Sequence, residues 1–561
     1  MPLADSRRVS VETELQATVE AWIAKDPDSE TRAELEALLA DGDEVALRER
    51  FAGRLEFGTA GLRAAMRAGP MGMNRVVVRE SAAGIARYLL ANVPDASLRG
   101  VVVAHDARHR SDTFAHDCAE VIAAHGILVV LAEPPQPTPV GVFAVRPLDA
   151  AAGIVITASH NPPADNGLKL FMGDAAQIVP PVDRHVADQI AAVAADGIVT
   201  PADVPPPAVE PLPESIVDAY RATTLERVPP PAVPIRIATT AMHGVGGALL
   251  ADLLAAAGHA DVHPVPEQLA PDPDFPTVGF PNPEEPGATD LLAGRMRSVD
   301  ADVGLALDPD ADRVAVLVRQ PDGAPRQLTG DEVGALLGDW LLAHVTDGPG
   351  RLVATTVVSS SLLARIAEHY GVRYEETLTG FKWLSRPALA HPELRQVLAY
   401  EEAIGYAIGP DAHDKDGLSG ALAVASMVAW EKAAGRTLLD ALDALHVRHG
   451  AHVTENFSLR YDGPGWRERR DETVGAVAAS PPTHVGANVV EAIGWLAPDV
   501  LRVDLARGLR VLVRPSGTEP KLKCYCEAVE PVGRDGLAAA RERARRRLAA
   551  TRAALLALLG A

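Results

Sequence analysis

A strand, loop, helix, strand pattern occurs three times along this chain, at residues 100–133, 235–265 and 351–380. Each passage begins with a short apolar run, continues into a helical stretch and ends in a second apolar run. A βαβ unit of this kind lays its two strands parallel in one sheet and packs the helix on a face of that sheet. The pattern therefore predicts three α/β domains of one general plan.

The chain beyond about residue 450 follows a different pattern. Strand-like runs at 500–517 and 521–529 precede a long basic helical stretch, which predicts a smaller α+β domain. Proline-rich segments at 200–215 and 228–234 are typical of domain boundaries, and the first is a candidate for a stiff linker. The expected division is a helical lead-in at 1–50, α/β domains at 51–205, 206–322 and 323–448, and an α+β domain at 449–561.

Charge and composition restrict the partners of this chain. A formal net charge of −22 would repel nucleic acid and anionic membranes over most of the surface, so neither partner is expected. No stretch is long and apolar enough to span a membrane, and the N-terminus does not have the pattern of a secretory signal. The three cysteines lack the spacing of a disulfide framework or a zinc site, which favours a cytoplasmic protein. A small anionic substrate remains possible where cationic side chains gather locally.

The segment 156–170 places a serine, an imidazole, an amide and an ammonium group in a turn directly after an apolar run. The residues Ala150–Ile156 predict a buried parallel strand, and turn-forming residues follow it. Ser159 is therefore expected to be exposed on a loop at the carboxyl end of a strand, where open α/β sheets bind ligands. The same polar groups can also serve only the backbone of an ordinary turn.

A second candidate site follows the strand-like residues 305–307. Asp308, Asp310 and Asp312 occupy alternate positions there, and three carboxylates this close repel one another unless a cation or hydrogen-bond donors compensate. Oxygen-only ligands suit a hard ion such as Mg²⁺. The start of an EF-hand loop has similar spacing, but the glycine and the distal glutamate of that motif are missing. A plain acidic turn is the alternative.

Four further segments carry groups that can bind a phosphorylated ligand. In the segment 511–525 a guanidinium, two hydroxyls and a glycine can cradle a phosphate, or can belong to a simple hairpin turn. In the segment 399–409 Glu401 and Glu402 stand at a predicted strand end, where carboxylates can accept hydrogen bonds from sugar hydroxyls or lie in solvent. Two weaker signals are a glycine turn ending in Arg63 and a turn at 379–384 that presents Lys382.

The order and wording of these segments resemble the α-D-phosphohexomutase superfamily, which contains phosphoglucomutases, phosphomannomutases and phosphopentomutase-like relatives. The resemblance runs from about Phe57 to Tyr525 and includes TASHNP, DPDADR, EEAIG and RPSGTEPK in the order of that superfamily. It implies an α/β fold of four domains around a central cleft, three similar α/β domains and a smaller α+β domain. It also implies an isomerase that transfers a phosphoryl group through a phosphoserine, with one Mg²⁺ per chain and a sugar 1,6-bisphosphate as intermediate and activator.

The resemblance assigns a role to each candidate residue. Ser159 would be the phosphoserine and, with Asp308, Asp310 and Asp312, would hold the Mg²⁺. Lys169 and Arg63 would assist proton transfer and stabilise the moving charge, and His160, the neighbour of the nucleophile, would be the fourth catalytic residue. The residues expected to contact the phosphosugar are Arg313, Thr379, Gly380, Lys382, Glu401, Ala403, Arg514, Ser516, Gly517 and Thr518.

The sugar that such an enzyme would prefer is left open. The expected activity is transfer of phosphate between C1 and C6 of glucose and/or mannose phosphates, by a monomer or a homodimer. Many hexose mutases have a serine at the position of Ala403, and the EEAIGY, TGFKW and DKDG segments resemble the subgroup that includes phosphopentomutase-like members. A phosphopentomutase is therefore the first alternative. A metal-dependent sugar phosphatase and a non-catalytic sugar-phosphate binder are further alternatives.

Overall fold

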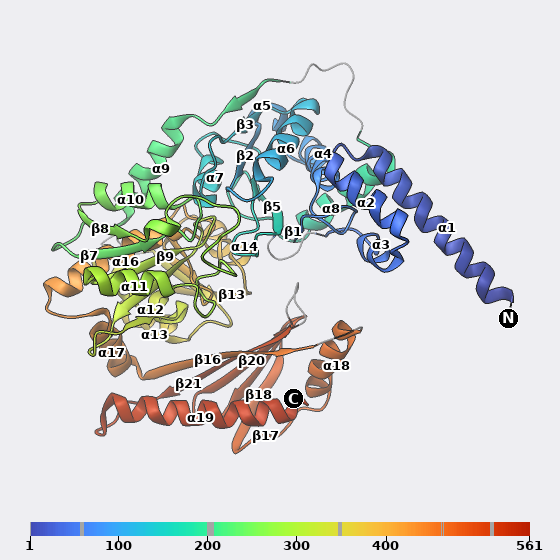
Figure 1. Cartoon of the computed structure of the whole chain (residues 1–561). Coiled ribbons are helices and arrows are strands. Elements are labelled where there is room, and N and C mark those ends of the chain that lie inside the picture. The colour runs from blue at the N-terminus through green and yellow to red at the C-terminus, as the bar shows by residue number, and fades with distance from the viewer. Residues whose placement is uncertain are drawn as a thin grey trace. The chain divides into compact units, whose positions relative to one another are not determined.

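The computed structural model describes residues 2–56, 61–198, 207–345, 350–461, 463, 465–515 and 521–560, with side chains from residue 14 onward (Figure 1). These residues form two compact units. The first unit comprises residues 1–230, 234–317 and 405–425, and the second comprises residues 231–233, 318–404 and 426–561.

A six-stranded sheet forms the centre of the N-terminal part of the first unit. Its strand order is β1-β5-β4-β2-β3-β6. Strands β4, β2, β3 and β6 run parallel, and β5 runs antiparallel between β1 and β4. The strands are β1 (Leu62–Ala65), β2 (Val101–His105), β3 (Val129–Leu131), β4 (Ala152–Ile156), β5 (Asp165–Met172) and β6 (Val209–Pro211).

Helices bury the apolar faces of this sheet. Strands β2 and β4 are buried along their whole length, as expected for central parallel strands covered on both faces. The helices of this part are α4 (Arg75–Asn92), α5 (Ala96–Arg99), α6 (Ser111–Ala124), α7 (Thr138–Ala144), α8 (Val182–Asp196) and α9 (Glu214–Arg227).

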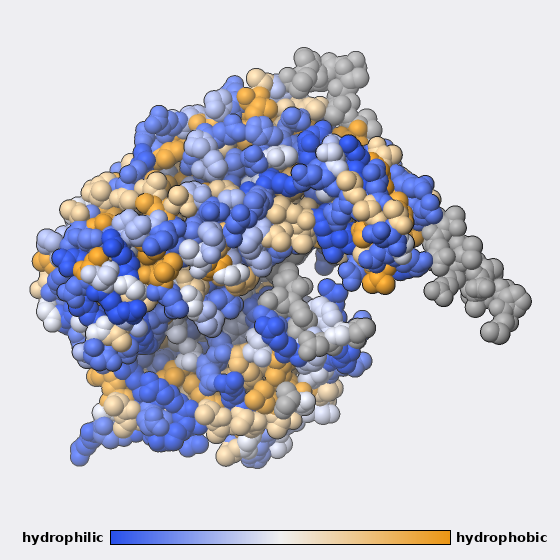
Figure 2. Space-filling model, in the orientation of Figure 1, coloured by the Kyte–Doolittle hydropathy of each residue, from blue (hydrophilic) through white to orange (hydrophobic). Residues whose placement is uncertain are grey.

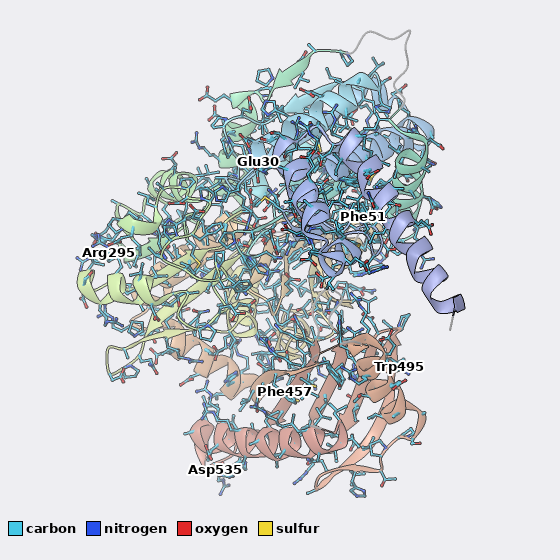
Figure 3. The ribbon with its side chains drawn as sticks, turned by 45° about the vertical axis from the view of Figure 1, so that its right-hand side comes forward. Glu30, Phe51, Arg295, Phe457, Trp495 and Asp535 are labelled. Atoms are coloured by element: carbon cyan, nitrogen blue, oxygen red, sulfur yellow. The ribbon has the colours of Figure 1, made fainter. Side chains whose placement is uncertain are left out.

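Three N-terminal helices precede this sheet. They are α1 (Pro2–Lys25), α2 (Ser29–Asp41) and α3 (Glu44–Arg50). Trp22 and Phe51, the latter labelled in Figure 3, meet edge to face with ring centroids 5.9 Å apart. Both belong to an apolar cluster that also contains Val76 and Val77 of α4, so the lead-in packs on the first domain through its own small core.

A second sheet of the first unit has the order β10-β9-β7-β8. Strand β7 pairs parallel with both β8 and β9. The elements are β7 (Arg236–Thr240), α10 (Gly247–Ala256), β8 (Asp261–Pro264), the 3₁₀ helix Pro266–Gln268, α11 (Asp290–Val299), β9 (Val303–Leu307) and β10 (Val314–Arg319). Strand β15 (Gly405–Ile408) and the start of α16 (Gly417–Ala433) complete this unit.

The second unit begins with a parallel arrangement of β13, β12 and β14, in which β12 is central. Helices α12 and α13 pack on these strands, and α17 packs on the two helices. The elements are β11 (Pro325–Gln327), α12 (Gly330–His344), β12 (Arg351–Thr356), α13 (Leu362–Tyr370), β13 (Arg373–Thr377), α14 (Phe381–Leu384), α15 (Arg386–Ala390), β14 (Arg395–Glu401) and α17 (Leu438–His449).

The C-terminal part of the second unit is a sheet of order β16-β21-β20-β19-β18-β17, with antiparallel neighbours throughout. Trp495 on β18 is half exposed, whereas Phe457 on β16 packs against Arg552 (Figure 3). The elements are β16 (Ala451–Arg460), α18 (Trp466–Ala479), β17 (His484–Val485), β18 (Asn488–Ala497), β19 (Val500–Leu505), β20 (Leu509–Pro515), β21 (Lys521–Glu530) and α19 (Gly536–Leu558).

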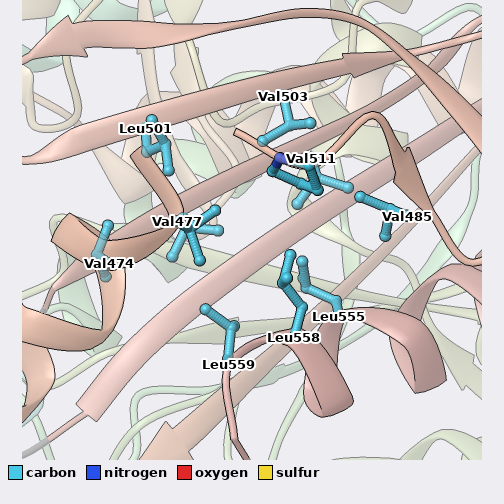
Figure 4. A pocket seen from close by; sticks show the side chains of 11 residues that line it. Val474, Val477, Val485, Leu501, Val503, Val511, Leu555, Leu558 and Leu559 are labelled. Atoms are coloured by element: carbon cyan, nitrogen blue, oxygen red, sulfur yellow. The ribbon is translucent and has the colours of Figure 1, made fainter. Parts of the chain in front are cut away.

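Helices α18 and α19 close one face of this antiparallel sheet. Figure 4 shows valine and leucine side chains from both helices converging with those of β17, β19 and β20. The gap between them is wholly apolar and only about 10 Å³ in volume. It is a seam of a packed core rather than a ligand site, because even one water needs about this volume together with polar partners.

The structure confirms the main predictions of fold. All three predicted βαβ passages form parallel pairs, β2 with β3, β7 with β8 and β12 with β13. The C-terminal part is the predicted α+β arrangement. The expected linker at 200–215 differs in part, because Val209–Pro211 forms edge strand β6; residues 200–206 lie outside the described residues.

Over the described part of the chain, no helix has both the length and the apolar character that crossing a membrane requires. The face shown in Figure 2 carries hydrophilic residues throughout, with apolar residues in small scattered groups.

A buried polar network joins the two parts of the second unit. Glu527 on β21 accepts hydrogen bonds from the Ser360 hydroxyl (2.6 Å), the Ser361 amide (2.8 Å) and Arg510 Nη2 (2.8 Å). Asp331 lies beside this network and accepts from the Ser360 amide at 2.7 Å. Burial, together with nearby acidic groups, raises the pKa of Asp331 to about 7.

We expect Asp331→Asn to stabilise the protein at neutral pH. The unfolded chain releases the Asp331 proton near pH ~4, but the folded protein holds it up to about pH 7, so stability falls as pH rises through this window. Asparagine keeps the acceptor oxygen and removes the titration. The gain in unfolding free energy should grow from near zero at about pH 4 to as much as about 4 kcal/mol at about pH 8.

Chemical unfolding of both proteins at several pH values measures this difference. Asp339→Asn is the matched control, because Asp339 lies on the same helix but is partly exposed and pairs with Arg448. A gain at Asp331 that stays constant with pH would contradict the role of the buried carboxyl.

Candidate active site

The loop between β4 and β5 carries Ser159 in a conformation that is uncommon for a residue with a side chain. Its φ is 52°, and its amide donates to the Thr157 hydroxyl at 2.8 Å. Arg108 holds this loop in place by donating hydrogen bonds to the carbonyls of Ser159 (2.5 Å) and Asn161 (2.7 Å). A left-handed φ costs free energy that surrounding contacts must offset, so this clamp holds the serine in a set position.

Two functional groups of the same unit contact the Ser159 hydroxyl. Its Oγ donates to Asp308 Oδ2 at 3.0 Å and lies 3.2 Å from His160 Nδ1. The side chain of His160 is partly buried near Arg313 and Arg63, and loss of hydration together with these two cations holds the pKa of His160 well below its usual range. The imidazole is therefore neutral at neutral pH and able to accept a proton.

Asp308, Asp310 and Asp312 follow β9 in one tight turn. All three side chains are fully buried, and one carboxylate oxygen from each lies within 4.8 Å of the others. The amide of Arg313 donates to Asp308 Oδ1 at 3.0 Å, and the Thr138 hydroxyl donates to Asp310 Oδ2 at 2.7 Å. These donors offset only part of the repulsion between three buried carboxylates.

Two lysines supply most of the remaining compensation. Lys169 on β5 donates to Asp310 Oδ2 (2.8 Å) and Asp312 Oδ2 (2.7 Å), and Lys415 Nζ lies 2.8 Å from the same oxygen of Asp312. Burial alone would raise the pKa of Asp312, but these ammonium groups outweigh it and hold that pKa below the usual range. Burial and the two neighbouring carboxylates raise the pKa of Asp308 well above it.

The carboxylate cluster has the donor set of a cation site. The Oδ1 atoms of Asp310 and Asp312 are buried and accept no hydrogen bond from the residues that the structure describes. A buried carboxylate oxygen without a donor is costly, and a hard cation with oxygen ligands would satisfy both atoms at once. The side chains present therefore fit a divalent ion.

The loop that carries Lys415 packs directly on the turn of the three aspartates. The Gly417 amide donates to the Ala311 carbonyl at 3.1 Å, and a Cβ at Gly417 would lie 2.4 Å from the Arg313 carbonyl oxygen. Only glycine allows this backbone approach. Lys415 is thereby held against Asp312 by main-chain contacts.

The structure brings together the sequence-predicted residues of the first unit. Arg63 donates to Asn161 Oδ1 of the serine loop at 2.9 Å, and the Arg313 guanidinium lies 3.8 Å from Asp312. Two expectations are wrong in detail. Ser159 is 2% exposed rather than exposed, because its hydroxyl is turned onto Asp308, and Arg63 lies within strand β1 rather than in a turn.

The predicted substrate residues of the second unit lie at three places. Thr379 and Gly380 precede the short helix α14, which carries Lys382 as a buried side chain rather than in the predicted turn. Glu401 is the last residue of β14, as predicted, and Ala403 follows it.

The third place in the second unit is the end of strand β20. Arg514 lies there with its side chain 13% exposed, and its Nε is 3.6 Å from a carboxylate oxygen of Asp499. Strand β21 pairs antiparallel with β20, so the predicted phosphate loop connects two strands of a hairpin. Ser516, Gly517 and Thr518 themselves lie outside the described residues.

Three contributors to the site were not identified from the sequence. Arg108 and Thr138 each follow a strand of the first sheet, β2 and β3 respectively, a position that is a weak signal by itself. Lys415 belongs to the DKDG segment, which the sequence analysis used only to compare subgroups. In the sequence Lys415 is a lysine between two aspartates, followed by glycine, which is only a weak signal of a site.

Comparison with known proteins gives matches to the domain models of one protein family. The domain models of phosphoglucomutase/phosphomannomutase match four parts of the chain: α/β/α domain I at residues 54–196, domain II at 217–323, domain III at 329–447 and the C-terminal domain at 470–543.

Individual relatives cover nearly the same span. A probable phosphomannomutase of Haemophilus influenzae is 40% identical over 468 residues, covering 82% of this chain and 93% of the relative. A phosphopentomutase of Mus musculus is 32% identical over 596 residues, covering 95% and 93%. A crystal structure of a phosphoglucomutase/phosphomannomutase family protein from Burkholderia thailandensis has a TM-score of 0.67 at 22% identity, covering 89% of this chain and 97% of that one; this likeness concerns the fold alone.

The cation site predicts how one substitution changes metal binding. Asp310→Asn removes one of the negative charges around the site, so its affinity for Mg²⁺ should fall at least about tenfold. Calorimetric titration of wild type and variant with Mg²⁺ measures the change. Asp322→Asn, in an exposed turn of the same half of the chain, is the control and should bind as wild type does. Equal affinity in Asp310→Asn would exclude this carboxylate from the site.

Proposed function

This chain belongs to the phosphoglucomutase/phosphomannomutase family and is an isomerase of the phosphosugar mutase type, and we propose that it moves phosphate between C1 and C6 of a hexose, glucose and/or mannose. The observation that carries the proposal is the Ser159 hydroxyl, which lies 3.0 Å from Asp308 in the carboxylate cluster. A hydroxyl in that place can receive and return a phosphoryl group next to a bound cation.

The proposed cycle begins with Ser159 phosphorylated. The phosphoryl group passes to the free hydroxyl of a hexose monophosphate, whose proton leaves to a base, and the Ser159 oxygen is released as the leaving group. The resulting hexose 1,6-bisphosphate turns around, and its other phosphate returns to Ser159. Phosphate has then moved between C1 and C6, and the enzyme has regained its starting form.

His160 and Lys169 suit different parts of this transfer. The neutral imidazole of His160, 3.2 Å from Ser159 Oγ, can hold a proton as the serine alternates between alcohol and ester. Lys169 is cationic, because the Asp310 and Asp312 carboxylates raise its pKa against the effect of burial. Lys169 and Arg63 would stabilise the negative charge of the moving group, and Arg313 would contact the phosphoserine or the sugar.

The proposed metal ligands are Asp308, Asp310 and Asp312 with an oxygen of the Ser159 phosphate. Mg²⁺ bound there would withdraw charge from the phosphoryl oxygens. The donor set is oxygen only, which fits this ion.

The substrate residues of the second unit are proposed by the same family resemblance. Glu401 would bind sugar hydroxyls shared by the two binding orientations. Arg514, Ser516, Gly517 and Thr518 would hold the phosphate that is not transferred. Thr379, Gly380 and Lys382 would complete the sugar contacts. Support for Glu401 is its position at the carboxyl end of β14, where parallel sheets place ligand-binding groups.

A pentose 1-phosphate is the second candidate substrate. Ala403 has no hydroxyl with which to contact a sugar, at a position where many hexose mutases have serine. The phosphopentomutase of Mus musculus also matches 95% of this chain at 32% identity. The higher identity, 40%, is to a probable phosphomannomutase, which is why hexose is proposed first.

Initial rates on glucose 1-phosphate, mannose 1-phosphate and ribose 1-phosphate test the proposal, with Mg²⁺ and a trace of glucose 1,6-bisphosphate present. We expect a hexose phosphate to give the highest kcat/KM, and we expect Ser159→Ala to lose at least about 10³-fold in kcat, because the nucleophile is absent. Ser81→Ala, which removes a buried hydroxyl on helix α4 of the same domain, is the control for general damage.

The outcomes separate the alternatives. Preference for ribose 1-phosphate would replace the hexose proposal with the pentose one. Release of inorganic phosphate without isomerisation would indicate a phosphatase. Wild-type activity in Ser159→Ala would exclude the phosphoserine cycle.

A further inference from the structure

A cavity of about 350 Å³ lies in the first unit, apart from the Ser159 hydroxyl and its neighbours. Helices α7 and α9 form one wall, and the segment 411–416 forms another. Part of the lining is apolar, with Pro139, Val142 and Phe143. The remainder is polar and charged. Its volume and mixed lining are those of a site for a small amphipathic molecule.

Arg227 is the unusual residue of this cavity. Its side chain is only 8% exposed, and its Nη2 is buried without a hydrogen-bond partner among the described residues. The nearest carboxylate, Asp411, lies 3.6 Å away, beyond hydrogen-bond distance, and pairs more closely with Arg146 at 2.7 Å. A buried guanidinium nitrogen without an acceptor is costly, which points to an acceptor supplied by a ligand.

The backbone makes room for this arginine. A Cβ at Gly409 would lie 2.7 Å from Cδ of Arg227, so a larger residue there would displace the guanidinium. Glycine at this position leaves room for the Arg227 side chain. The placement of Arg227 is therefore built into the fold rather than a chance rotamer.

The charges around the cavity define the ligand. Asp414 pairs with Lys415, and Asp416 accepts from the Tyr220 hydroxyl at 2.9 Å and from the first amides of α16. His413 is held neutral, because burial lowers its pKa. Of the remaining groups, Arg146 and Arg227 face the single carboxylate of Asp411. Arg146 is the closer partner of Asp411, at 2.7 Å against 3.6 Å for Arg227. Arg227 is therefore the cation of the lining that an anionic ligand group would contact.

The cavity is connected to the carboxylate cluster through one loop. The residues 411–416 line the cavity, and within them Lys415 ion-pairs with Asp312 at 2.8 Å. Asp414 accepts from Gln177 at 3.1 Å, and Gly417 packs on the backbone of Ala311 and Arg313. A ligand that moves this loop therefore moves a countercharge of a metal ligand.

We propose that this cavity is a second ligand site, which binds a small monoanion with an apolar body and is coupled to the metal site through Lys415. The anionic group, a carboxylate or a phosphate monoester, lies on Arg227. The apolar body lies against Phe143 and Val142. Occupancy changes the position of the Lys415 ammonium and hence the affinity of the aspartate cluster for Mg²⁺.

Calorimetric titration of the full chain with benzoate and with phenyl phosphate tests the site. Benzyl alcohol is the uncharged comparison. Arg227→Met keeps the length of the side chain and removes the charge, so it should weaken binding of the anionic probe at least about tenfold. Arg221→Met is the matched control, because Arg221 lies on the same helix and pairs with Asp252 at the surface; it should bind as wild type does.

Two further variants separate loss of the proposed site from poor folding and from binding of the probe elsewhere. Thr223→Phe places a ring in the cavity and leaves the Arg227 side chain unchanged. It should also weaken binding, and it provides the test if Arg227→Met folds poorly. Arg514→Met tests whether a phosphate probe binds the phosphate loop instead. Binding that survives in Arg227→Met and Thr223→Phe, or that is lost only in Arg514→Met, would overturn the second site.

The coupling has its own measurement, which does not depend on catalysis. Saturating benzoate or phenyl phosphate, whichever binds, should change the Mg²⁺ affinity of wild type at least about fivefold and leave that of Arg227→Met unchanged. An unchanged Mg²⁺ affinity in wild type would overturn the coupling through Lys415. Because no sugar phosphate is used, failure of the proposed mutase activity and failure of this inference give different results.

Discussion

Mutual repulsion among three buried carboxylates is the constraint around which the first unit is organised. Asp308, Asp310 and Asp312 are fully buried within 4.8 Å of one another, an arrangement that a folded chain tolerates only with compensation from every side. The compensation comes from elements far apart in sequence: α7 supplies Thr138, β5 supplies Lys169, and the loop before α16 supplies Lys415. The sheet order that brings β5 beside β4 therefore serves the site as much as the core.

The compensation is distributed unevenly over the carboxylate cluster. Lys169 and Lys415 share a single oxygen of Asp312, while the second oxygens of Asp310 and Asp312 accept no hydrogen bond within the part of the chain that the structure describes. Some carboxylate oxygens of the cluster are therefore compensated by lysines, and others are available to bind a cation. Ser159 Oγ contacts the same cluster at Asp308, so positive charge bound by the three carboxylates would lie near negative charge added to the serine.

Much of the fold could be predicted from local patterns in the sequence. Apolar runs of strand length followed by helical periodicity predicted all three βαβ units, and the change of pattern near residue 450 predicted the α+β part. Motif residues that follow a strand, such as Ser159 and Asp308, were also predictable, because parallel strands place their carboxyl ends at one edge. The left-handed φ of Ser159 and its burial were not, since both depend on the Arg108 clamp and on Asp308, which lies 149 residues away along the chain.

Long-range pairing also explains why Lys415 could not be predicted as a site residue. Its ion-pair partner, Asp312, is distant in the sequence. A lysine between two aspartates in a polar loop resembles a solvated turn until the fold buries it against Asp312, about a hundred residues earlier in the chain. The loop is fixed to the turn of the aspartates by the Gly417 amide and to β15 by the Asp416 amide, which donates to the Tyr406 carbonyl at 2.7 Å, whereas residues 411–416 also line the cavity. A loop held at one end by tight packing and bordered at the other by open volume transmits displacement toward the held end. The Lys415 ammonium lies between the two, which makes Asp312 the carboxylate of the cluster most sensitive to what fills the cavity.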